Sequence, residues 1–399
     1  MGTGLAMKAL TWHGIEDVRV TDVPDPVIAH TTDAIVRVTS TAICGSDLHL
    51  YRVLAPYLQP GDVLGHEFMG IVEEVGPDVA TLAVGDRVVV PFNISCGRCW
   101  MCQRGLFAQC ETTQNTETGK GASLFGYTSL YGSVPGGQAE YVRVPHADFG
   151  PIVIPQELPD ERFLYLSDIL PTAWQAVEYA DVSGNDTLAV LGLGPVGQLA
   201  VRSARHRGVG RVIGVDLVPD RVELARAHGA EVIDGRDTDV AQALIDMTDG
   251  RGPDAVIDAV GMEAHGNPLS EKVIGAASRL PKPVARGAIE RFGIDRLAAL
   301  HTAVAAVRRG GTLSISGVYG GMADPMPMME LFDKGLTIRM GQCHVRRWSD
   351  ELLDIARADG DVLGLERLAT HHARLEDAPD LYRIFQEKQD ECLKVVLQP

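Results

Sequence analysis

The stretch TLAVLGLGPVG at residues 187–197 decides the fold, because an apolar run leads directly into a glycine-rich turn. Its three glycines are spaced as G-x-G-x-x-G, and a helix-like pattern follows. In this spacing the first glycine permits a tight turn, the second lets the backbone approach a pyrophosphate, and the third lets helix and strand pack closely. The context of strand and helix predicts a dinucleotide-binding turn. The residues assigned to it are Gly192, Gly194, Pro195, Val196 and Gly197.

Downstream of the turn, apolar runs typical of strands alternate with helix-like segments. This alternation predicts a parallel sheet with crossover helices. Asp216 ends the second strand, where a carboxylate binds both ribose hydroxyls and repels a 2′-phosphate, which favours NAD over NADP. Arg221 follows in the next helix, and its cation would tolerate such a phosphate. The predicted strands are 187–191, 211–216, 254–260, 311–316 and 336–341, and the predicted helices are 197–207 and 220–228.

The part of the chain before the glycine turn has a different character. Short apolar-alternating runs at 34–39, 70–75 and 87–91 are separated by Gly, Pro and Asp, which predicts a β-rich region. A tight group of cysteines with the pattern C-x2-C-x2-C-x7-C follows these runs. Four thiolates this close can hold one tetrahedral Zn²⁺ at about 2.3 Å, whereas disulfides and an iron–sulfur cluster are the alternatives. The four residues are Cys96, Cys99, Cys102 and Cys110.

A second candidate metal site is scattered along the chain. Cys44 begins the run CGSDLH at residues 44–49, and His66 and Glu67 follow in Gly65-His66-Glu67. A thiolate and an imidazole are good zinc ligands, and a carboxylate can complete a three-ligand set with one open position. Taken singly, Cys44 reads as a buried core cysteine and His66 as a hydrogen-bonded structural histidine.

Together these motifs resemble a zinc-dependent member of the medium-chain dehydrogenase/reductase superfamily, the alcohol dehydrogenase family. The elements occur in the family's order and span most of the chain. Where many relatives place a third zinc cysteine, this chain has Leu166-Ser167-Asp168. Asp168, the segment GGQAEYV at 136–142 and the extra stretch after Met262 resemble the branch of glutathione-independent formaldehyde dehydrogenase and formaldehyde dismutase.

The resemblance implies an α/β protein, with a GroES-like β-rich catalytic domain and a Rossmann NAD-binding domain. The catalytic domain is expected at 1–168, with a structural zinc lobe at about 93–112. The NAD-binding domain is expected at 169–341, with an insertion at about 262–295. The tail at 342–399 is expected to return to the catalytic domain.

The same resemblance assigns residue roles. Cys44, His66 and Asp168 become ligands of a catalytic zinc, with Glu67 as the rival carboxylate, and the four clustered cysteines hold a structural zinc. Ser46 and His49 would pass the substrate's proton outward. Phe92 reads equally well as a pocket wall or as an ordinary core aromatic. The further residues expected along the cofactor are Thr172, Val318 and Arg339.

Composition excludes several classes of partner. The chain has 399 residues, with 36 Lys and Arg against 53 Asp and Glu, a net charge of −17. This excess of negative charge argues against binding to nucleic acid or to anionic membranes, because both partners are themselves negatively charged. Residues 1–10 lack a secretory signal pattern, and the longest apolar run, 187–201, is too short and too interrupted to span a bilayer. Seven cysteines, four of them clustered, fit metal binding in a cytoplasmic protein.

The function implied is hydride transfer to NAD from a small alcohol or aldehyde hydrate, with formaldehyde as the first choice. Such a protein would be a homo-oligomer, a dimer or tetramer. A general alcohol or polyol dehydrogenase is the alternative within the class, and a dismutase would result if the stretch after Met262 trapped the cofactor. A zinc-free reductase of the superfamily and a non-catalytic zinc-binding interaction module are further alternatives.

Overall fold

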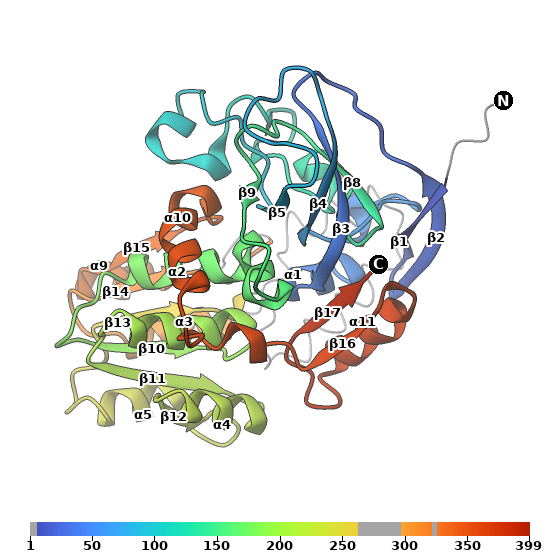
Figure 1. Ribbon diagram of the computed structural model, residues 1–399. Helices are drawn as coiled ribbons and strands as arrows, with labels where there is room; N and C mark the ends of the chain where they lie inside the picture. Colours follow the sequence, from blue (N-terminus) through green and yellow to red (C-terminus); the bar gives the residue numbers. More distant parts are fainter. Residues whose placement is uncertain (1–5, 262–296, 321–324) are drawn as a thin grey trace. The chain divides into compact units, whose positions relative to one another are not determined.

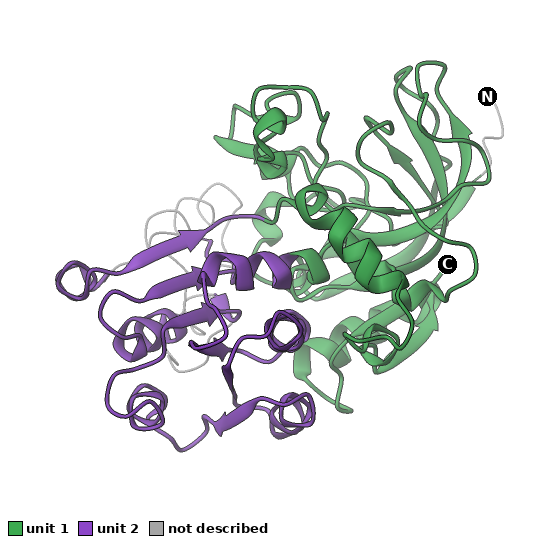
Figure 2. Cartoon of the chain, turned by 60° about the vertical axis from the view of Figure 1, so that its left-hand side comes forward, with its two compact units in different colours: residues 1–171, 343–399 green, residues 172–342 purple. Residues whose placement is uncertain are grey.

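The computed structural model describes residues 6–261, 297–320 and 325–399 (Figure 1). The insertion expected at about 262–295 therefore lies outside the described residues. The chain divides into two compact units, which Figure 2 shows in different colours. Unit 1 comprises residues 1–171 and 343–399, and unit 2 comprises residues 172–342.

Unit 2 is built on a parallel six-stranded sheet with the order β12-β11-β10-β13-β14-β15. Helix α3 packs on β10 and β11, and α8 packs on β13 and against α5. This is the Rossmann arrangement, so the predicted fold class is confirmed. Its strands are β10 (Thr187–Leu191), β11 (Arg211–Asp216), β12 (Glu231–Asp234), β13 (Ala255–Asp258), β14 (Thr312–Ile315) and β15 (Thr337–Met340). Its helices are α2 (Ile169–Ala180), which begins in unit 1, α3 (Pro195–His206), α4 (Pro219–Ala227), α5 (Val240–Asp246), α8 (Ala298–Ala306) and α9 (Met328–Lys334).

The glycine turn joins β10 to α3 as the sequence predicts. Gly192 has φ +86°, a left-handed conformation that only glycine adopts without strain. Helix α3 begins at Pro195, whose fixed φ suits the first helical position. A Cβ on Gly197 would lie 1.9 Å from the Gly192 carbonyl oxygen, so the helix can approach the strand this closely only with glycine there.

Unit 1 carries a mostly antiparallel sheet with the order β16-β17-β3-β4-β5-β9, and β8 pairs with β3. A hairpin of β1 and β2 stands beside it. The strands are β1 (Ala6–Gly14), β2 (Asp17–Pro24), β3 (Ala34–Ile43), β4 (Glu67–Val75), β5 (Arg87–Val90), β6 (Gln114–Asn115), β7 (Lys120–Ala122), β8 (Tyr141–Val144), β9 (Ile152–Val153), β16 (His371–Arg374) and β17 (Val395–Gln398). The helices are α1 (Gly45–Tyr51), α10 (Val345–Arg357) and α11 (Ala378–Glu387).

The carboxyl-terminal segment completes unit 1. Strand β17 pairs antiparallel with β3 and parallel with β16. Tyr382 and Phe385 of α11 pack in one buried cluster with Leu10 and Tyr51 from the other end of the chain. Residues near position 390 therefore lie beside the end of β3, where the chain turns into α1. Among the described residues, no helix has both the length and the hydrophobicity that a bilayer crossing needs.

Replacing Gly197 by alanine tests the close approach of α3 to β10. We expect Gly197→Ala to lower the free energy of unfolding by about 1–3 kcal/mol, because its Cβ meets a backbone oxygen that cannot move aside. Urea denaturation followed by circular dichroism measures the change. Gly184→Ala is the matched control in the same unit, since its Cβ would lie 3.4 Å from the nearest atom. Equal stabilities of the two variants would contradict the packing argument.

Candidate metal centre and cofactor turn

Four potential ligands meet in the interior of unit 1. Cys44 lies between β3 and α1, His66 directly precedes β4, and Glu67 is the first residue of β4. Asp168 follows the 3₁₀ turn 164–167, where the Ser167 carbonyl accepts the Phe92 N–H. One ligand atom from each of Cys44, His66, Glu67 and Asp168 lies within 4.8 Å of the others, and all four residues are buried. The structure thus brings together groups that are up to 124 residues apart in sequence.

Three of these groups have the spacing of a zinc site. Cys44 Sγ lies 3.6 Å from Asp168 Oδ2, and His66 Nε2 lies 3.3 Å from the same oxygen. Zinc bonds of about 2.0–2.3 Å set tetrahedral ligand atoms about 3.3–3.8 Å apart. The distances from the Asp168 carboxylate to the thiol and to the imidazole therefore match the spacing of zinc ligands.

The charges of the site also fit a cation. Burial, together with the charges of Glu67 and Asp168, raises the pKa of the Cys44 thiol to about 12. Burial acts to lower the pKa of His66, but the Asp47 charge and hydrogen bonds to Asp168 and Asp47 outweigh it and hold that pKa well above its ordinary value. The group therefore retains protons wherever a metal ion does not replace them.

Glu67 is held differently from the other three. Its Oε1 lies 2.6 Å from Lys394 Nζ, and both side chains are fully buried. Burial disfavours the lysine charge, but the Glu67 carboxylate outweighs it and raises the pKa of Lys394. Lys394 Nζ also donates to the Ile43 carbonyl at 3.0 Å. Because Lys394 engages one oxygen of its carboxylate and offsets its charge, we rank Glu67 below Asp168 as a candidate ligand.

Helix α1 supplies the groups around His66. Asp47 Oδ1 lies 3.0 Å from His66 Nδ1; the contact has the length of a hydrogen bond without its alignment. Ser46 Oγ lies 3.0 Å from His66 Nε2. His49 lies about one turn further along the same helix and is buried.

Aromatic rings surround the metal centre. The Phe92 and Tyr127 rings stand edge-on to the His66 ring, with centroids 6.3 and 6.2 Å away. Phe92 is also part of a buried cluster with Leu124 and Val345, so it serves as a core residue as well as a neighbour of the site.

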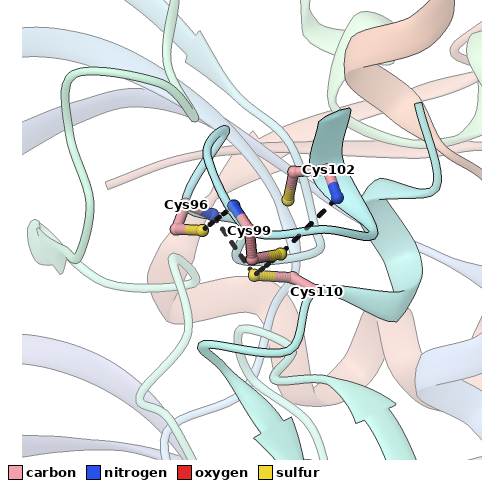
Figure 3. Close-up of side chains that lie close together, drawn as sticks. All are labelled: Cys96, Cys99, Cys102 and Cys110. Atoms are coloured by element: carbon pink, nitrogen blue, oxygen red, sulfur yellow. Dashed lines mark hydrogen bonds between the residues drawn. The ribbon is translucent and has the colours of Figure 1, made fainter. Parts of the chain in front are cut away.

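The four clustered cysteines form a separate group (Figure 3). Their sulfurs lie within 4.8 Å of one another, and Cys99 Sγ is 3.9 Å from Cys110 Sγ, close to the spacing in a four-sulfur zinc site. None of the cysteines forms a disulfide, which rules out that alternative within this structure. Despite the cost of burial, N–H groups of Cys102 and Glu111 lower the pKa of Cys99 to about 6. Such hydrogen bonds favour thiolates, the form that binds metal.

The glycine turn of unit 2 is closed by Asp216. Its Oδ2 accepts the Leu193 N–H at 2.6 Å, and its Oδ1 accepts the Leu217 and Val218 N–H groups at 2.7 and 2.9 Å. A Cβ on Gly194 would lie 3.7 Å from Arg221 Nη1, so the guanidinium lies beside the turn. The turn thus has a glycine, a carboxylate and a cation close together, the groups that the sequence assigns to dinucleotide binding.

The other residues expected along the cofactor lie on different elements of unit 2. Thr172 is half-buried in α2, and Val318 is an exposed residue after β14 whose backbone packs on Gly261. Arg339 lies in the edge strand β15, separated from β10 by two strands, and pairs with Asp181 at 3.0 Å. The structure does not bring Arg339 to the glycine turn.

Sequence reasoning assigned no role to two residues of the metal centre. Asp47 lies inside the quoted CGSDLH run, and its position at the start of a helix was a usable signal. Lys394 carries no motif, and only the pairing of β17 with β3 brings it to Glu67.

Comparisons with known proteins agree with this geometry. The family profiles described as "Alcohol dehydrogenase GroES-like domain" and "Zinc-binding dehydrogenase" match residues 30–156 and 195–269. The uncharacterized zinc-type alcohol dehydrogenase-like protein AdhB of Bacillus subtilis (strain 168) is 42% identical over 401 residues, covering 98% of this chain and 100% of the relative. Glutathione-independent formaldehyde dehydrogenase of Pseudomonas aeruginosa (strain LESB58) is 35% identical over 370 residues, covering 88% and 86%. The structure of alcohol dehydrogenase TADH from Thermus sp. ATN1 superposes with a TM-score of 0.80 at 33% identity, covering 98% of this chain and 99% of that chain.

Metal content tests both clusters. We expect about two zinc ions per chain, because each cluster offers a complete ligand set. Cys44→Ala and Cys99→Ala should each leave one zinc, measured by elemental analysis of the dialysed protein. Cys392→Ala is the matched control, since this buried cysteine belongs to neither cluster, and it should keep two. An unchanged zinc content in Cys44→Ala would remove Cys44 from the ligand set.

The buried Glu67–Lys394 pair generates a pH-dependent prediction. Lys394→Met leaves the Glu67 carboxylate buried and unpaired, so we expect a loss of about 3–5 kcal/mol in unfolding free energy at pH 8. Burial raises the folded pKa of Glu67 above its unfolded value, so the folded variant binds more protons and the deficit shrinks towards pH 5.5. Urea denaturation at both pH values measures this.

The control for this variant is the double substitution Glu67→Gln with Lys394→Met. It removes both charges and should recover most of the lost stability, because no buried charge remains unpaired. A double variant as unstable as Lys394→Met would show that the loss comes from packing instead.

Proposed function

The chain belongs to the zinc-dependent medium-chain dehydrogenases of the alcohol dehydrogenase family, and from this premise we propose that it oxidises a small aldehyde hydrate or alcohol with NAD. Formaldehyde is the leading substrate. Its hydrate, a carbon bearing two hydroxyls, is formally an alcohol, and loss of hydride and a proton gives formic acid. The observation that carries the proposal is the convergence of Cys44, His66 and Asp168 in the interior of unit 1.

In this proposal Cys44, His66 and Asp168 hold the catalytic zinc, and the four clustered cysteines hold a structural one. When bound, zinc supplies a Lewis acid that lowers the pKa of a coordinated hydroxyl, and NAD supplies the hydride acceptor. Glu67 remains ion-paired with Lys394, whose positive charge offsets that of the Glu67 carboxylate beside the zinc ligands.

The chain's own residues then handle the proton. Ser46 Oγ, 3.0 Å from His66 Nε2, is placed to accept the proton of the substrate hydroxyl. His49 takes it from Ser46 and passes it on, since an imidazole can both accept and donate a proton. Both residues lie on α1, so one short helix fixes the relay relative to Cys44.

The preference for a small substrate rests on the aromatic surroundings. Phe92 and Tyr127 each lie edge-on to the His66 ring, so two bulky rings stand beside the proposed zinc ligand, an arrangement that favours a small substrate. The similarity to glutathione-independent formaldehyde dehydrogenase supports the same choice. The similarity to a Thermus alcohol dehydrogenase keeps a general alcohol dehydrogenase as the second candidate.

The preference for NAD rests on Asp216. Its carboxylate beside the glycine turn favours ribose hydroxyls and repels a 2′-phosphate. Arg221 lies close enough to the turn to bind the pyrophosphate, so its charge need not indicate NADP.

The proposed setting is a homo-oligomer in the cytoplasm. All seven cysteines are free thiols, as in a reducing compartment. Met329 and Phe332 of α9 and Met340 of the edge strand β15 are exposed to 81%, 85% and 60%. Exposed apolar side chains beside a strand edge support association with a second copy.

A steady-state panel tests the proposed reaction. We expect the highest kcat/KM with formaldehyde, lower values with ethanol and 1-octanol, and little activity with sorbitol, in each case with NAD above NADP. Absorbance at 340 nm gives the rates, and the Cys44→Ala variant is the blank. Good rates with 1-octanol and background rates with formaldehyde would contradict the proposed substrate and favour a general alcohol dehydrogenase.

A further inference from the structure

A chain of buried polar side chains leads from His66 to the carboxyl-terminal helix α11. His66 Nδ1 faces Asp47 Oδ1, and Asp47 Oδ2 accepts from Gln138 Nε2 at 3.3 Å. Gln138 Oε1 in turn accepts from the Tyr382 hydroxyl at 2.8 Å. Asp47, Gln138 and Tyr382 are all fully buried. Tyr382 lies 244 residues from Gln138, and all four residues belong to unit 1.

The orientation of the Gln138 amide follows from its neighbours. Its Nε2 faces two acceptors, the Ala42 carbonyl at 3.1 Å and the Asp47 carboxylate, whereas its Oε1 faces the Tyr382 hydroxyl. A reversed amide would turn its oxygen towards both acceptors. The Ala42 carbonyl and the Asp47 carboxylate, which only accept, therefore select the orientation in which Gln138 donates to Asp47, and the Tyr382 hydroxyl donates to the amide oxygen on the other side.

Packing fixes Gln138 in the same place. A Cβ on Gly65 would lie 2.4 Å from Gln138 Cγ, so the glutamine stem rests directly on the residue before His66. The Gln138 N–H also donates to the Leu64 carbonyl at 3.0 Å. Backbone and side chain of Gln138 are thus tied to the segment that carries His66.

The two oxygens of Asp47 face different partners. Oδ2 accepts the Cys44 N–H at 2.9 Å as well as Gln138 Nε2, which leaves Oδ1 for the His66 ring. A metal ion on Nε2 leaves the ring proton on Nδ1, so the position of Oδ1 determines how the ring is turned towards the metal.

We propose that Gln138 and Tyr382 are positioning residues that set the metal-binding orientation of His66 through Asp47. The inference rests on the proposed function in one respect, the binding of zinc by His66. Tyr382 anchors the amide oxygen of Gln138, Gln138 anchors the carboxylate of Asp47, and Asp47 presents its other oxygen to the imidazole Nδ1. The carboxyl-terminal helix thereby tunes a metal site formed by the first half of the chain.

Zinc release measures this role without relying on activity. Groups that orient a zinc ligand change metal affinity about 10–100-fold when removed. We expect Gln138→Met to release the catalytic zinc to a chromogenic chelator about tenfold faster than wild type, and Tyr382→Phe about threefold faster. The structural zinc in the same chain should leave at an unchanged rate, which separates local reorientation from general loosening of the fold.

Two controls make the experiment specific. Tyr51→Phe removes a hydroxyl from the ring that packs on Tyr382, at 5.5 Å between centroids, and should not alter zinc release. The double variant Gln138→Met with Tyr382→Phe should release zinc as fast as Gln138→Met alone, because Tyr382 acts only through Gln138. In the cobalt-substituted protein, the visible absorption of the catalytic ion should shift in Gln138→Met and Tyr382→Phe and stay unchanged in Tyr51→Phe.

The outcomes distinguish failure of the inference from failure of the proposed function. Tyr382→Phe with the release rate and cobalt spectrum of Tyr51→Phe would overturn the positioning role, as would full additivity in the double variant. Absence of a second zinc in wild-type protein would instead remove the metal centre on which the proposed function depends.

Discussion

The buried negative charge around His66 is the constraint on which the metal centre depends. Asp47, Glu67 and Asp168 lie in the interior beside the Cys44 thiol, where an uncompensated charge is costly. The protein supplies one cation of its own, Lys394, which pairs with Glu67. The raised pKa values of Cys44 and His66 show that negative charge in the site still needs a compensating positive charge. Bound protons provide it in the metal-free chain, and a divalent ion would provide it when bound.

The fold of unit 1 satisfies this constraint by bringing distant strands together. Strand β3 is central, because β4 lies on one side and β17 on the other. The end of β3 presents Cys44, the start of β4 presents His66, and the residue before β17 is Lys394. Cys44, His66 and Lys394 therefore depend on the pairing register of these three strands, because each residue directly adjoins a strand end. The closed cysteine lobe is a contrast, because its four thiols lie within 15 consecutive residues, Cys96 to Cys110, and need only local folding.

The two metal groups also differ in what they can do. The cysteine lobe offers four sulfurs, which complete a tetrahedron and leave no position for a substrate. The buried centre offers three ligands of different kinds, with Ser46 3.0 Å from the imidazole and two aromatic rings around it. Chemistry is therefore assigned to the second group, although the first is the clearer sequence signal. Glu67 illustrates why geometry matters here, since its pairing with Lys394, and not its residue type, separates it from Asp168.

The sequence by itself determined the family, the fold class, the glycine turn and the cysteine lobe. Each can be recognised from motifs whose residues are only a few positions apart, because local backbone geometry sets those spacings. It also proposed Cys44, His66 and Asp168 through family resemblance. Asp47 and Gln138 lie inside quoted motifs, and Tyr382 and Lys394 lie in none, but only the tertiary structure placed these four residues around the metal centre. Lys394 reaches Glu67 across 327 positions and Tyr382 reaches Gln138 across 244. Such contacts depend on strand pairing and on packing into one shared core, and they cannot be predicted from the spacing of residues along the chain.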